Sequence, residues 1–529
     1  MEHHWSRREF LRFMGRTMGA TALTYPGLVF PVARGSSAMA DFHPITPTSA
    51  DEVVLADGLE YHILVSWMDR INGAGERFGF NNDYTAFFSI GGNPHDGLLW
   101  VNHEEVFSGY FLSPDDPQEK TMEHIEQEVL EVGGSIIRIN KRDGHWRLVQ
   151  DDQYNRRINA STQIPIISEQ PVHGAREAVG TLGNCAGGFT PWKTVLTCEE
   201  NFNLFLGDVT FVSGTRVHEK DSYLGWERYL DHPPEHYGWV VEIDPFTGAA
   251  KKLTALGRFA HEGATVTQAK DGRPVVYMSD DKIDECIYKF VAAEPGSLAR
   301  GTLYVAATDT GRWLPLDVVR DPRLKEVFGS QTELLVRTRE AAKLVGGSPQ
   351  DRPEDIEIDP QSGAVLIALT KHPERPFGSI LKLAEKDNDP SAEEFTASTF
   401  LAGGHESGFA CPDNLVFDPQ GNLWICTDIY DLNQPPYHPF KNNGLFYLPM
   451  SGRHAGIPRQ VASAPSGAEL TGPTFSPDGR SLFLSVQHPG ENSTSPDTPS
   501  SHWPDGGDSL PRPSVIYVSG PLLDELTAV

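Results

Sequence analysis

The sequence predicts an all-β protein, a six-bladed β-propeller with insertions between the blades. A hairpin pattern recurs six times, each copy having a short strand, a turn rich in Gly, Pro, Asp or Asn, and a second short strand. The 50 glycines and 40 prolines are spread along the 529 residues, as expected for an all-β chain with frequent turns. The copies begin at Asp83, Asn184, His261, Pro353, Pro412 and Leu470. Six such hairpins indicate six blades, each completed by strands in the intervening segments.

Four copies also share an offset, which supports a true repeat. Cys185, Glu354, Asp413 and Thr471 each stand six residues before a proline. The spacing between copies is uneven, so insertions must separate some blades, and the candidates are residues 107–131, 202–236 and 310–350. Outer strands are expected at Gly238–Pro245 and Gly444–Leu448, and a closing strand at Ser514–Val518.

The N-terminus is predicted to be an export signal rather than part of the fold. Ser6-Arg-Arg-Glu-Phe-Leu11 matches a twin-arginine motif, a weakly apolar stretch follows, and Ala38-Met-Ala40 offers a cleavage site. Residues 1–40 are therefore assigned to the signal, and residues 41–529 to a single β-propeller catalytic domain. The twin-arginine machinery is an expected partner, and the mature chain is expected to be periplasmic or secreted. No later run reaches the roughly 18 apolar residues of a membrane span.

Charge and cysteine content narrow the function further. The formal net charge of −28 argues against nucleic acid or an anionic membrane as a partner. Solubility alone would explain this negative charge, and cation binding is a further contributor. The five cysteines are an odd number without CxxC spacing, so at least one thiol is free or a ligand unless chains are cross-linked.

The hairpin geometry brings acidic residues to one place. In an antiparallel hairpin the start of the first strand and the end of the second lie at the same edge, which in a propeller faces one mouth of the central channel. The residues expected there are Asp83, Cys185, Glu262, Glu354, Asp413 and Glu469 from the first strands, and Glu104, Glu199, Glu200, Asp280, Asp281, Asp428 and His488 from the second. So many like charges require cations, and oxygen ligands suit calcium. Taken singly, each acidic residue also fits a turn, and His103, His261 and His488 are more often structural than ligands.

The stretch from Asn184 to Asn201, NCAGGFTPWKTVLTCEEN, is the most informative in the chain. It reads as strand, turn, strand, and it brings the Cys185 thiol towards the Glu199–Glu200 pair. Soft and hard ligands together suit a metal site. The alternative is a buried cysteine in a hairpin with two surface glutamates. Cys198, in the same hairpin, is expected to pack inside the blade.

This stretch resembles the signature of the PhoX-type alkaline phosphatases. Further stretches that resemble the family are Val101–Glu104, His261–Glu262, Arg352–Asp355, Pro412–Asn414 and Gln487–Glu491. The resemblance implies a six-bladed propeller and an iron–calcium cluster, with Cys185 as the thiolate for iron. The metal ligands assigned in this way are Cys185, Glu104, Glu200, Glu262, Glu354, Asp413 and Glu469. The chain departs from the family at Lys193 and Val195, where Gly and Trp are usual. It also has Ala175-Arg-Glu-Ala178 where a phosphate-binding lysine is expected.

The sequence thus predicts an exported metal-dependent phosphatase that hydrolyses phosphate monoesters, a small phosphorylated substrate being its partner. Arg352 is assigned as the catalytic and substrate-binding residue, because arginine grips phosphate bidentately. A salt bridge to a neighbouring glutamate is the alternative for Arg352. Alternatives for the whole protein are another calcium-dependent hydrolase, such as a lactonase, and a non-catalytic binding propeller. Neither a Gly-x-Ser-x-Gly elbow nor a P-loop is present in the sequence.

Overall fold

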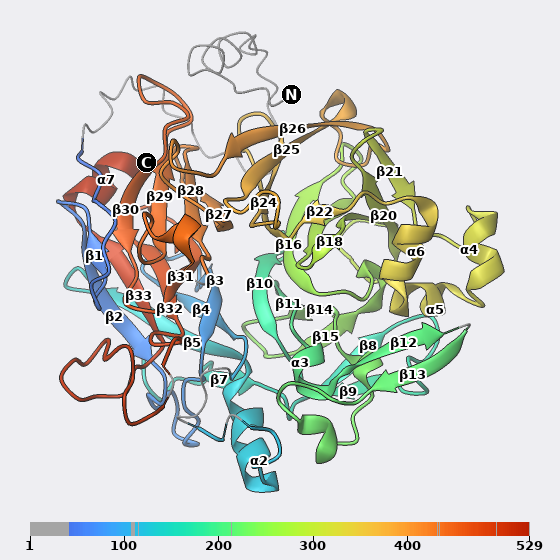
Figure 1. Cartoon of the computed structure of the whole chain (residues 1–529), viewed down its shortest axis with the longest axis horizontal. Helices are drawn as coiled ribbons and strands as arrows, with labels where there is room; N and C mark the ends of the chain where they lie inside the picture. Colours follow the sequence, from blue (N-terminus) through green and yellow to red (C-terminus); the bar gives the residue numbers. More distant parts are fainter. Residues whose placement is uncertain are drawn as a thin grey trace. The chain divides into compact units, whose positions relative to one another are not determined.

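In the computed structural model, six largely antiparallel sheets stand around a central axis (Figure 1), which confirms the predicted six-bladed propeller. The structure describes residues 42–106, 112–114, 116–212, 214–430, 432, 434–493 and 495–527. The predicted signal in residues 1–40 lies outside this part of the chain. No helix in these ranges combines the length and apolar character of a membrane span.

Each blade begins with a strand beside the axis and proceeds outward through hydrogen-bonded neighbours. The innermost strands of blades one to six are β3 (Asn82–Ser89), β10 (Asn184–Phe189), β16 (His261–Gln268), β23 (Pro353–Ile358), β27 (Pro412–Phe417) and β31 (Glu469–Phe475). The second strands are β4 (Asp96–His103), β11 (Val195–Glu199), β17 (Pro274–Asp280), β24 (Val365–Leu369), β28 (Leu423–Thr427) and β32 (Leu482–Gln487). All six predicted hairpins therefore form.

The outer strands complete the blades. The third strands are β5 (Gly133–Arg142), β14 (Val240–Ile243), β19 (Ile287–Ala292), β25 (Ser379–Glu385), β29 (Gly444–Leu448) and β33 (Ser514–Ser519). The fourth are β6 (His145–Leu148), β15 (Ala250–Leu253), β20 (Gly301–Ala307), β26 (Phe395–Ala402), β30 (Arg459–Ser463) and β2 (Glu60–Ser66). Further edge strands are β1 (Val54–Leu55), β7 (Arg156–Ile158), β8 (Gln163–Ile167), β9 (Glu177–Val179) and β21 (Arg312–Pro315). The strands predicted within 238–245, 444–448 and 514–518 are thus present as β14, β29 and β33.

The ring is closed by the N-terminal part of the described chain. Strand β2 pairs antiparallel with β33 and so forms the outer strand of blade six, while β1 extends blade five. Residues far apart in sequence therefore hold the last two blades to the start of the chain. This closure removes the free edge that an open ring would leave.

The hydrophobic core lies between neighbouring blades, because each sheet buries both of its faces. Strands such as β24, with the sequence VLIAL, and β28, with LWICT, are buried at every residue. Blades one and two meet through Trp100 and Val195, and blades six and one through Phe483 and Leu99. The outer strand β26 is instead mostly exposed or half-buried. The continuous apolar runs of the second strands follow from burial on two faces.

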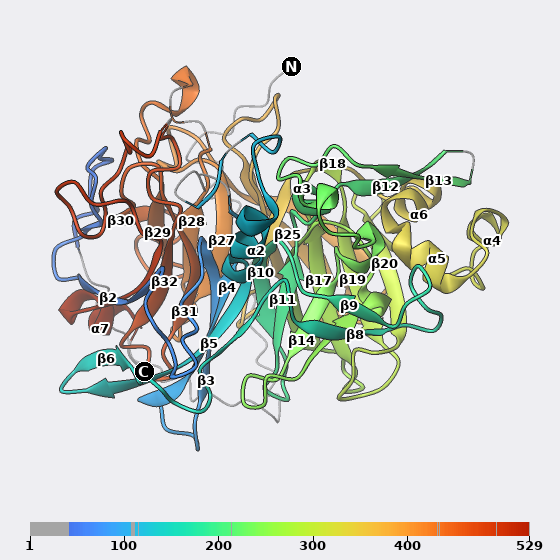
Figure 2. The same cartoon turned by 90° about the horizontal axis from the view of Figure 1, so that it is seen from below.

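The three predicted insertions contain most of the helices. The first holds α2 (Met122–Glu131), and the second holds α3 (Asn203–Leu206), the hairpin of β12 (Asp208–Val212) and β13 (Thr215–Glu219), and the 3-10 helices η2 (Trp226–Arg228) and η3 (Pro234–His236). The third holds α4 (Pro322–Val327), α5 (Gln331–Val336) and α6 (Thr338–Val345), and a small ladder pairs β18 (Ile283–Glu285) with β22 (Gln350–Asp351). The remaining helices of the described residues are η4 (Thr254–Leu256), η5 (Lys386–Asn388), η6 (Pro435–Tyr437) and α7 (Pro521–Thr527). In Figure 2 α3, β12, β13 and β18 lie on one side of the ring.

Candidate metal centre

A bulge interrupts each of the six innermost strands, and in blades one to five it follows directly after the first paired residue. The pairing with the second strand skips two residues there, for example between Asn184 and Gly187 in blade two. The first skipped residues in blades one to five are Asp83, Cys185, Glu262, Glu354 and Asp413. A bulge bends a strand and redirects a side chain, so these five side chains point away from the regular ladder and towards the axis.

Blade six breaks this pattern, and the proline offset of Thr471 is misleading there. Thr471 is still paired, with Ser485, and the first skipped residue is Gly472. Gly472 has φ +53°, and a Cβ atom on it would lie 2.6 Å from the carbonyl oxygen of Asp83. Only glycine fits this close approach of backbones. Blade six therefore supplies its carboxylate from Glu469, at the start of β31.

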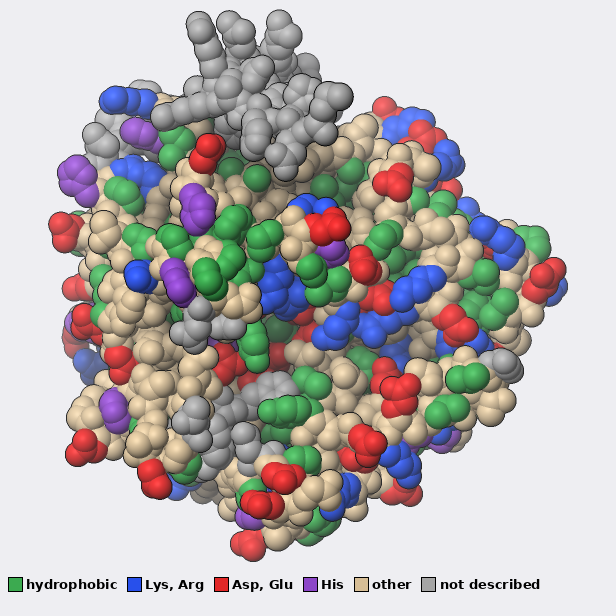
Figure 3. All heavy atoms as spheres, viewed as in Figure 1, with side chains coloured by type: hydrophobic (Ala, Val, Ile, Leu, Met, Phe, Trp, Pro, Cys, Tyr) green, Lys and Arg blue, Asp and Glu red, His purple; other side chains and the backbone are tan. Residues whose placement is uncertain are grey.

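All the residues assigned to the site from the sequence line one cavity of about 190 Å³. Its lining includes the seven assigned metal ligands and Arg352, and it adds Asp83, Glu105, Asn201, Asp281, Asp428, Tyr430, Gln487, His488 and Glu491. On the face shown in Figure 3, acidic side chains lie in a hollow near the middle, with basic side chains beside it. The predicted convergence at one mouth is therefore present for every assigned ligand.

The potential ligand atoms lie close enough to share cations. Three groups have their ligand atoms within 4.8 Å of one another: Asp83 with Glu104 and Cys185, Cys185 with Glu200 and Glu262, and Glu262 with Glu354 and Asp413. The Cys185 Sγ lies 3.1 Å from Asp83 Oδ2 and 3.2 Å from Glu262 Oε1. Cys185 and Glu262 each belong to two groups, so the three groups form one continuous cluster.

Side chains of neighbouring blades hold the bulged backbone in place. The Asn102 amide donates to the carbonyl oxygens of Cys185 and Ala186, and Thr197 Oγ1 donates to the same amide's oxygen at 2.8 Å. Asp355 Oδ2 accepts from the backbone N–H of Leu415 at 2.9 Å, and Asn414 Oδ1 accepts from that of Gly472 at 2.8 Å. Backbone groups freed by the bulges are thereby satisfied, which fixes the direction of each ligand side chain.

The electrostatics of the cluster favour bound cations. Burial, and then the neighbouring carboxylates, raise the pKa values of Glu104, Glu262 and Asp413 well above the ordinary range. Burial also raises the pKa of Glu200 to about 7, although Lys282 opposes the shift. For the Cys185 thiol, burial followed by the charges of Asp83 and Glu104 raises the pKa. Bound divalent or trivalent cations would lower these pKa values, because they stabilise the ionised carboxylates and the thiolate.

Arg352 enters the cavity from the residue directly before β23, and it is bound to carboxylates. Its guanidinium donates to Asp281 Oδ1 at 2.8 Å and Oδ2 at 2.7 Å, and lies 2.7 Å from Glu354 Oε1. Burial lowers its pKa and the surrounding carboxylates raise it, with a net rise, so the side chain stays charged. Its φ of +53° is rare for a residue with a side chain, which marks a backbone held in place by its surroundings. The salt bridge to Glu354 that the sequence left as an alternative is present.

Two of the carboxylates expected at the mouth, Glu199 and Asp280, lie elsewhere, because each is bound to a cationic side chain away from the cavity. Glu199 accepts from Lys252 Nζ at 2.6 Å and from the backbone N–H groups of Leu182 and Trp239. Asp280 forms a two-point ion pair with Arg339. Successive residues of a strand point to opposite faces, so only the second member of each acidic pair, Glu200 or Asp281, reaches the cavity. The prediction that Glu199 and Asp280 join the cluster was wrong.

Of the three histidines considered in the sequence, two lie away from the cavity and one lines it. His103 is buried, with its ring nitrogens 3.0 Å from the Phe80 carbonyl and 2.8 Å from Ser135 Oγ, and His261 lies 2.8 Å from the Gly257 carbonyl. Both are structural. His488 lines the cavity and lies 2.7 Å from Glu469 Oε1.

Lys282 is the functional candidate that the sequence reasoning missed. Its Nζ lies 3.0 Å from Glu200 Oε1 and 3.0 Å from Asn201 Oδ1, so it comes from blade three to the edge of the cavity and contacts two of the residues that line it. The sequence analysis looked for a lysine only just before Cys185. The signal that was available is position, because Lys282 directly follows Asp281 at the end of a second strand.

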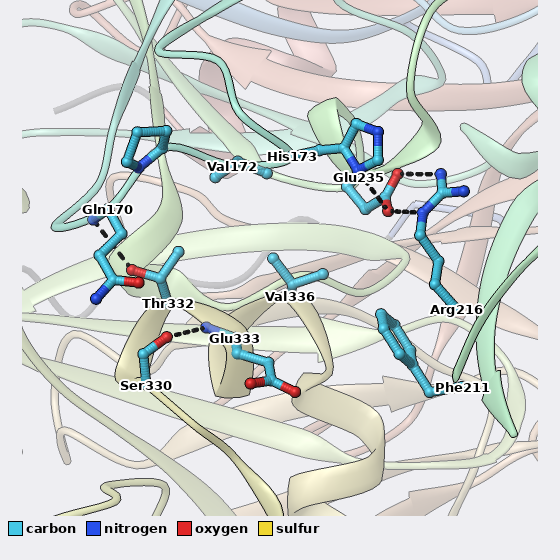
Figure 4. Close-up of a pocket in the computed structure, with 11 residues that line it drawn as sticks. Gln170, Val172, His173, Phe211, Arg216, Glu235, Ser330, Thr332, Glu333 and Val336 are labelled. Atoms are coloured by element: carbon cyan, nitrogen blue, oxygen red, sulfur yellow. Dashed lines mark hydrogen bonds and ion pairs between the residues drawn. The ribbon is translucent and has the colours of Figure 1, made fainter. Parts of the chain in front are cut away.

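A second, larger cavity, of about 320 Å³, has a different chemistry. Figure 4 shows its lining, which comes from the insertions and from the loop between β8 and β9. Glu235 pairs there with Arg216 and, at 3.4 Å, with His173, and the Ser330 hydroxyl accepts from the Glu333 backbone. Its charged groups bind one another, so the axial cavity is the better candidate for chemistry.

Comparison with known proteins places the chain in a family. The model of the alkaline phosphatase PhoX family matches residues 40–490, so the chain belongs to that family. The fold and the site therefore belong to a metal-dependent phosphatase. Membership of this family argues against both alternatives, the lactonase and the non-catalytic binding propeller.

The solved structures give a particular relative. Pseudomonas fluorescens PhoX, in complex with vanadate, a transition state analogue, is 28% identical over 92% of this chain and 98% of its own, with a TM-score of 0.81. A gluconolactonase from Xanthomonas campestris is 10% identical over 90% of this chain and 100% of its own, with a TM-score of 0.34, too low to bear on activity. A search of curated proteins finds no match.

Proposed function

We propose that this phosphatase is an exported enzyme that hydrolyses phosphate monoesters at an iron–calcium cluster in the axial cavity. The observation that carries the proposal is the meeting of one thiol, a set of buried carboxylates and Arg352 in a single cavity. Vanadate is bound by the Pseudomonas relative as a transition state analogue, which supports phosphoryl transfer as the reaction of this chain.

The residues present fit these metals. Cys185 offers the soft ligand that suits iron, in a group with Glu200 and Glu262, whereas Glu262, Glu354 and Asp413 form an all-oxygen group that suits calcium. Glu469 fits the same role, because its buried Oε2 has no hydrogen-bond partner among the described residues. Bound metals would supply Lewis acidity, polarising the phosphoryl oxygens and stabilising negative charge during transfer.

The phosphate would be held by cationic side chains beside the cluster. Arg352 has the planar fork that matches two phosphate oxygens, and Lys282 adds a point charge from the neighbouring blade. Both now contact carboxylates, Asp281 and Glu200 respectively. Phosphate would be bound between these two cations and the cluster, with Arg352 acting as the substrate-binding and catalytic residue.

Metal analysis of the purified, active protein tests the cluster. We expect both iron and calcium, because the ligand set contains one thiolate and many carboxylates. Removal of calcium with a calcium-selective chelator should abolish activity, and readdition of calcium should restore it. Active protein that contains neither metal would contradict the proposal.

The export signal is tested separately. Replacing Arg7 and Arg8 together by lysine should trap the precursor in the cytoplasm, because the twin-arginine route reads that pair. Cell fractionation followed by immunoblotting measures the distribution. Secretion of the double variant at the wild-type level would refute this route and leave the assignment of the metal site untouched.

A further inference from the structure

Cationic and aromatic side chains gather beside the cavity at blades three, four and five, where Arg352 and Tyr430 belong to the lining and Lys282 contacts the lining residues Glu200 and Asn201. They come from the ends of the second strands in blades three, four and five. In blade three Asp280 is the last residue paired with the inner strand, and in blade four it is Leu369. Lys282 and Lys371 each stand two residues further on, so they occupy equivalent positions on neighbouring blades. Arg352 enters between them, at the start of blade four.

Tyr430 completes this side of the mouth from blade five. It follows Thr427, the last paired residue there, and Asp428, whose Oδ2 lies 3.6 Å from Arg352 Nη1. Tyr430 lines the cavity, yet it is 65% exposed, more than the other exposed tyrosines Tyr223 and Tyr229. The Lys371 ammonium lies 5.5 Å from the centre of its ring. A cation over an aromatic face restrains the ring, so Tyr430 is a partly ordered apolar surface beside the phosphate-binding residues.

We propose that Tyr430 is the leaving-group platform of the active site, and that the enzyme prefers phosphate monoesters whose leaving group is a planar aromatic ring. This inference rests on the proposed monoesterase function and adds a substrate class to it. A phosphate held at Arg352 and Lys282 places the rest of the ester at the mouth, where an aromatic leaving group would stack on the Tyr430 ring and remove both surfaces from water. An alkyl leaving group is smaller and not planar, so it gains less from the same surface.

Steady-state kinetics on the metal-loaded enzyme test the platform. The probes are 1-naphthyl phosphate and glycerol 3-phosphate, measured with the wild type, Tyr430→Ala and Tyr430→Phe. Comparing each variant with the wild type on the same ester cancels the different intrinsic reactivities of the two esters. Tyr430→Ala should raise KM for the naphthyl ester by about threefold to tenfold, the usual worth of an aromatic pair. It should change kcat/KM for glycerol 3-phosphate by less than about twofold, and Tyr430→Phe should restore the wild-type KM because the ring is kept.

Tyr223→Ala is the matched control, since Tyr223 is also well exposed, at 55%, but does not line the cavity. It should leave both esters unchanged. Equal losses on both esters for Tyr430→Ala, or no loss on either, would overturn the platform while leaving the phosphatase intact. A wild-type enzyme that hydrolyses neither ester would instead overturn the monoesterase function, and the platform with it.

Discussion

Replacing Cys185 with alanine should remove iron from the protein and lower phosphatase activity by about a hundredfold or more, because the loss of even an outer partner of a metal ligand costs about tenfold to a hundredfold. The reason is that the Cys185 Sγ lies in two of the three ligand groups and is the sulfur donor that lines the cavity. Iron content and phosphate-ester kinetics, measured on the same preparations, give the result. Retention of full iron and full activity would show that the thiolate assignment is wrong.

Cys198→Ala is the matched control, because it removes a thiol from the same hairpin. Cys198 is fully buried and packs in the core between blades two and three. Its loss should cost about 1 to 3 kcal/mol of stability, as for other small core truncations, and should leave the iron in place. Thermal unfolding measures the first effect and metal analysis the second. Iron loss from both variants would point to a general loosening of blade two.

The ring of hairpins was predictable from the sequence because its signal is a repeat. The apolar second strands, such as Val365–Leu369, are long enough and buried enough to show as continuous runs. Closure by Glu60–Ser66 was not predictable, since pairing between distant edge strands leaves no local pattern. The positions of the three insertions were predicted, but their short strands and helices were not, because these elements depend on packing against the ring.

The sequence was enough to predict which residues form the site, but not which way each side chain points. A strand places the second member of Glu199-Glu200 or Asp280-Asp281 at the cavity and the first in the blade, and a register error of one residue exchanges them. The partners that decide this, the buried Lys252 and the half-buried Arg339, come from distant segments. The bulge in each inner strand, which aims Cys185 or Glu354 at the axis, is also a property of the paired ladder rather than of either strand alone.

Arg352→Ala should lower kcat/KM for phosphate monoesters by about a hundredfold to a thousandfold, the usual cost of losing one charged group that stabilises a transition state. The metals should stay bound, because Arg352 contacts the carboxylates as a cation and is not itself a ligand. Arg352→Lys should recover only part of the activity, since lysine keeps the charge but loses the two-point grip. Competitive inhibition by inorganic phosphate gives an independent readout, and its inhibition constant should rise in both variants.

Arg352 also neutralises buried carboxylates, so its removal will cost stability whatever its role in binding. Arg339→Ala separates the two effects. Arg339 makes the same kind of two-point ion pair with Asp280 that Arg352 makes with the adjacent Asp281, but Asp280 and Arg339 do not line the cavity. Breaking either buried pair should destabilise the fold by about 3 to 5 kcal/mol. Only Arg352→Ala should weaken phosphate inhibition. If Arg352→Ala binds phosphate and turns over monoesters as Arg339→Ala does, the substrate is held elsewhere in the cavity, and Lys282 becomes the residue to test.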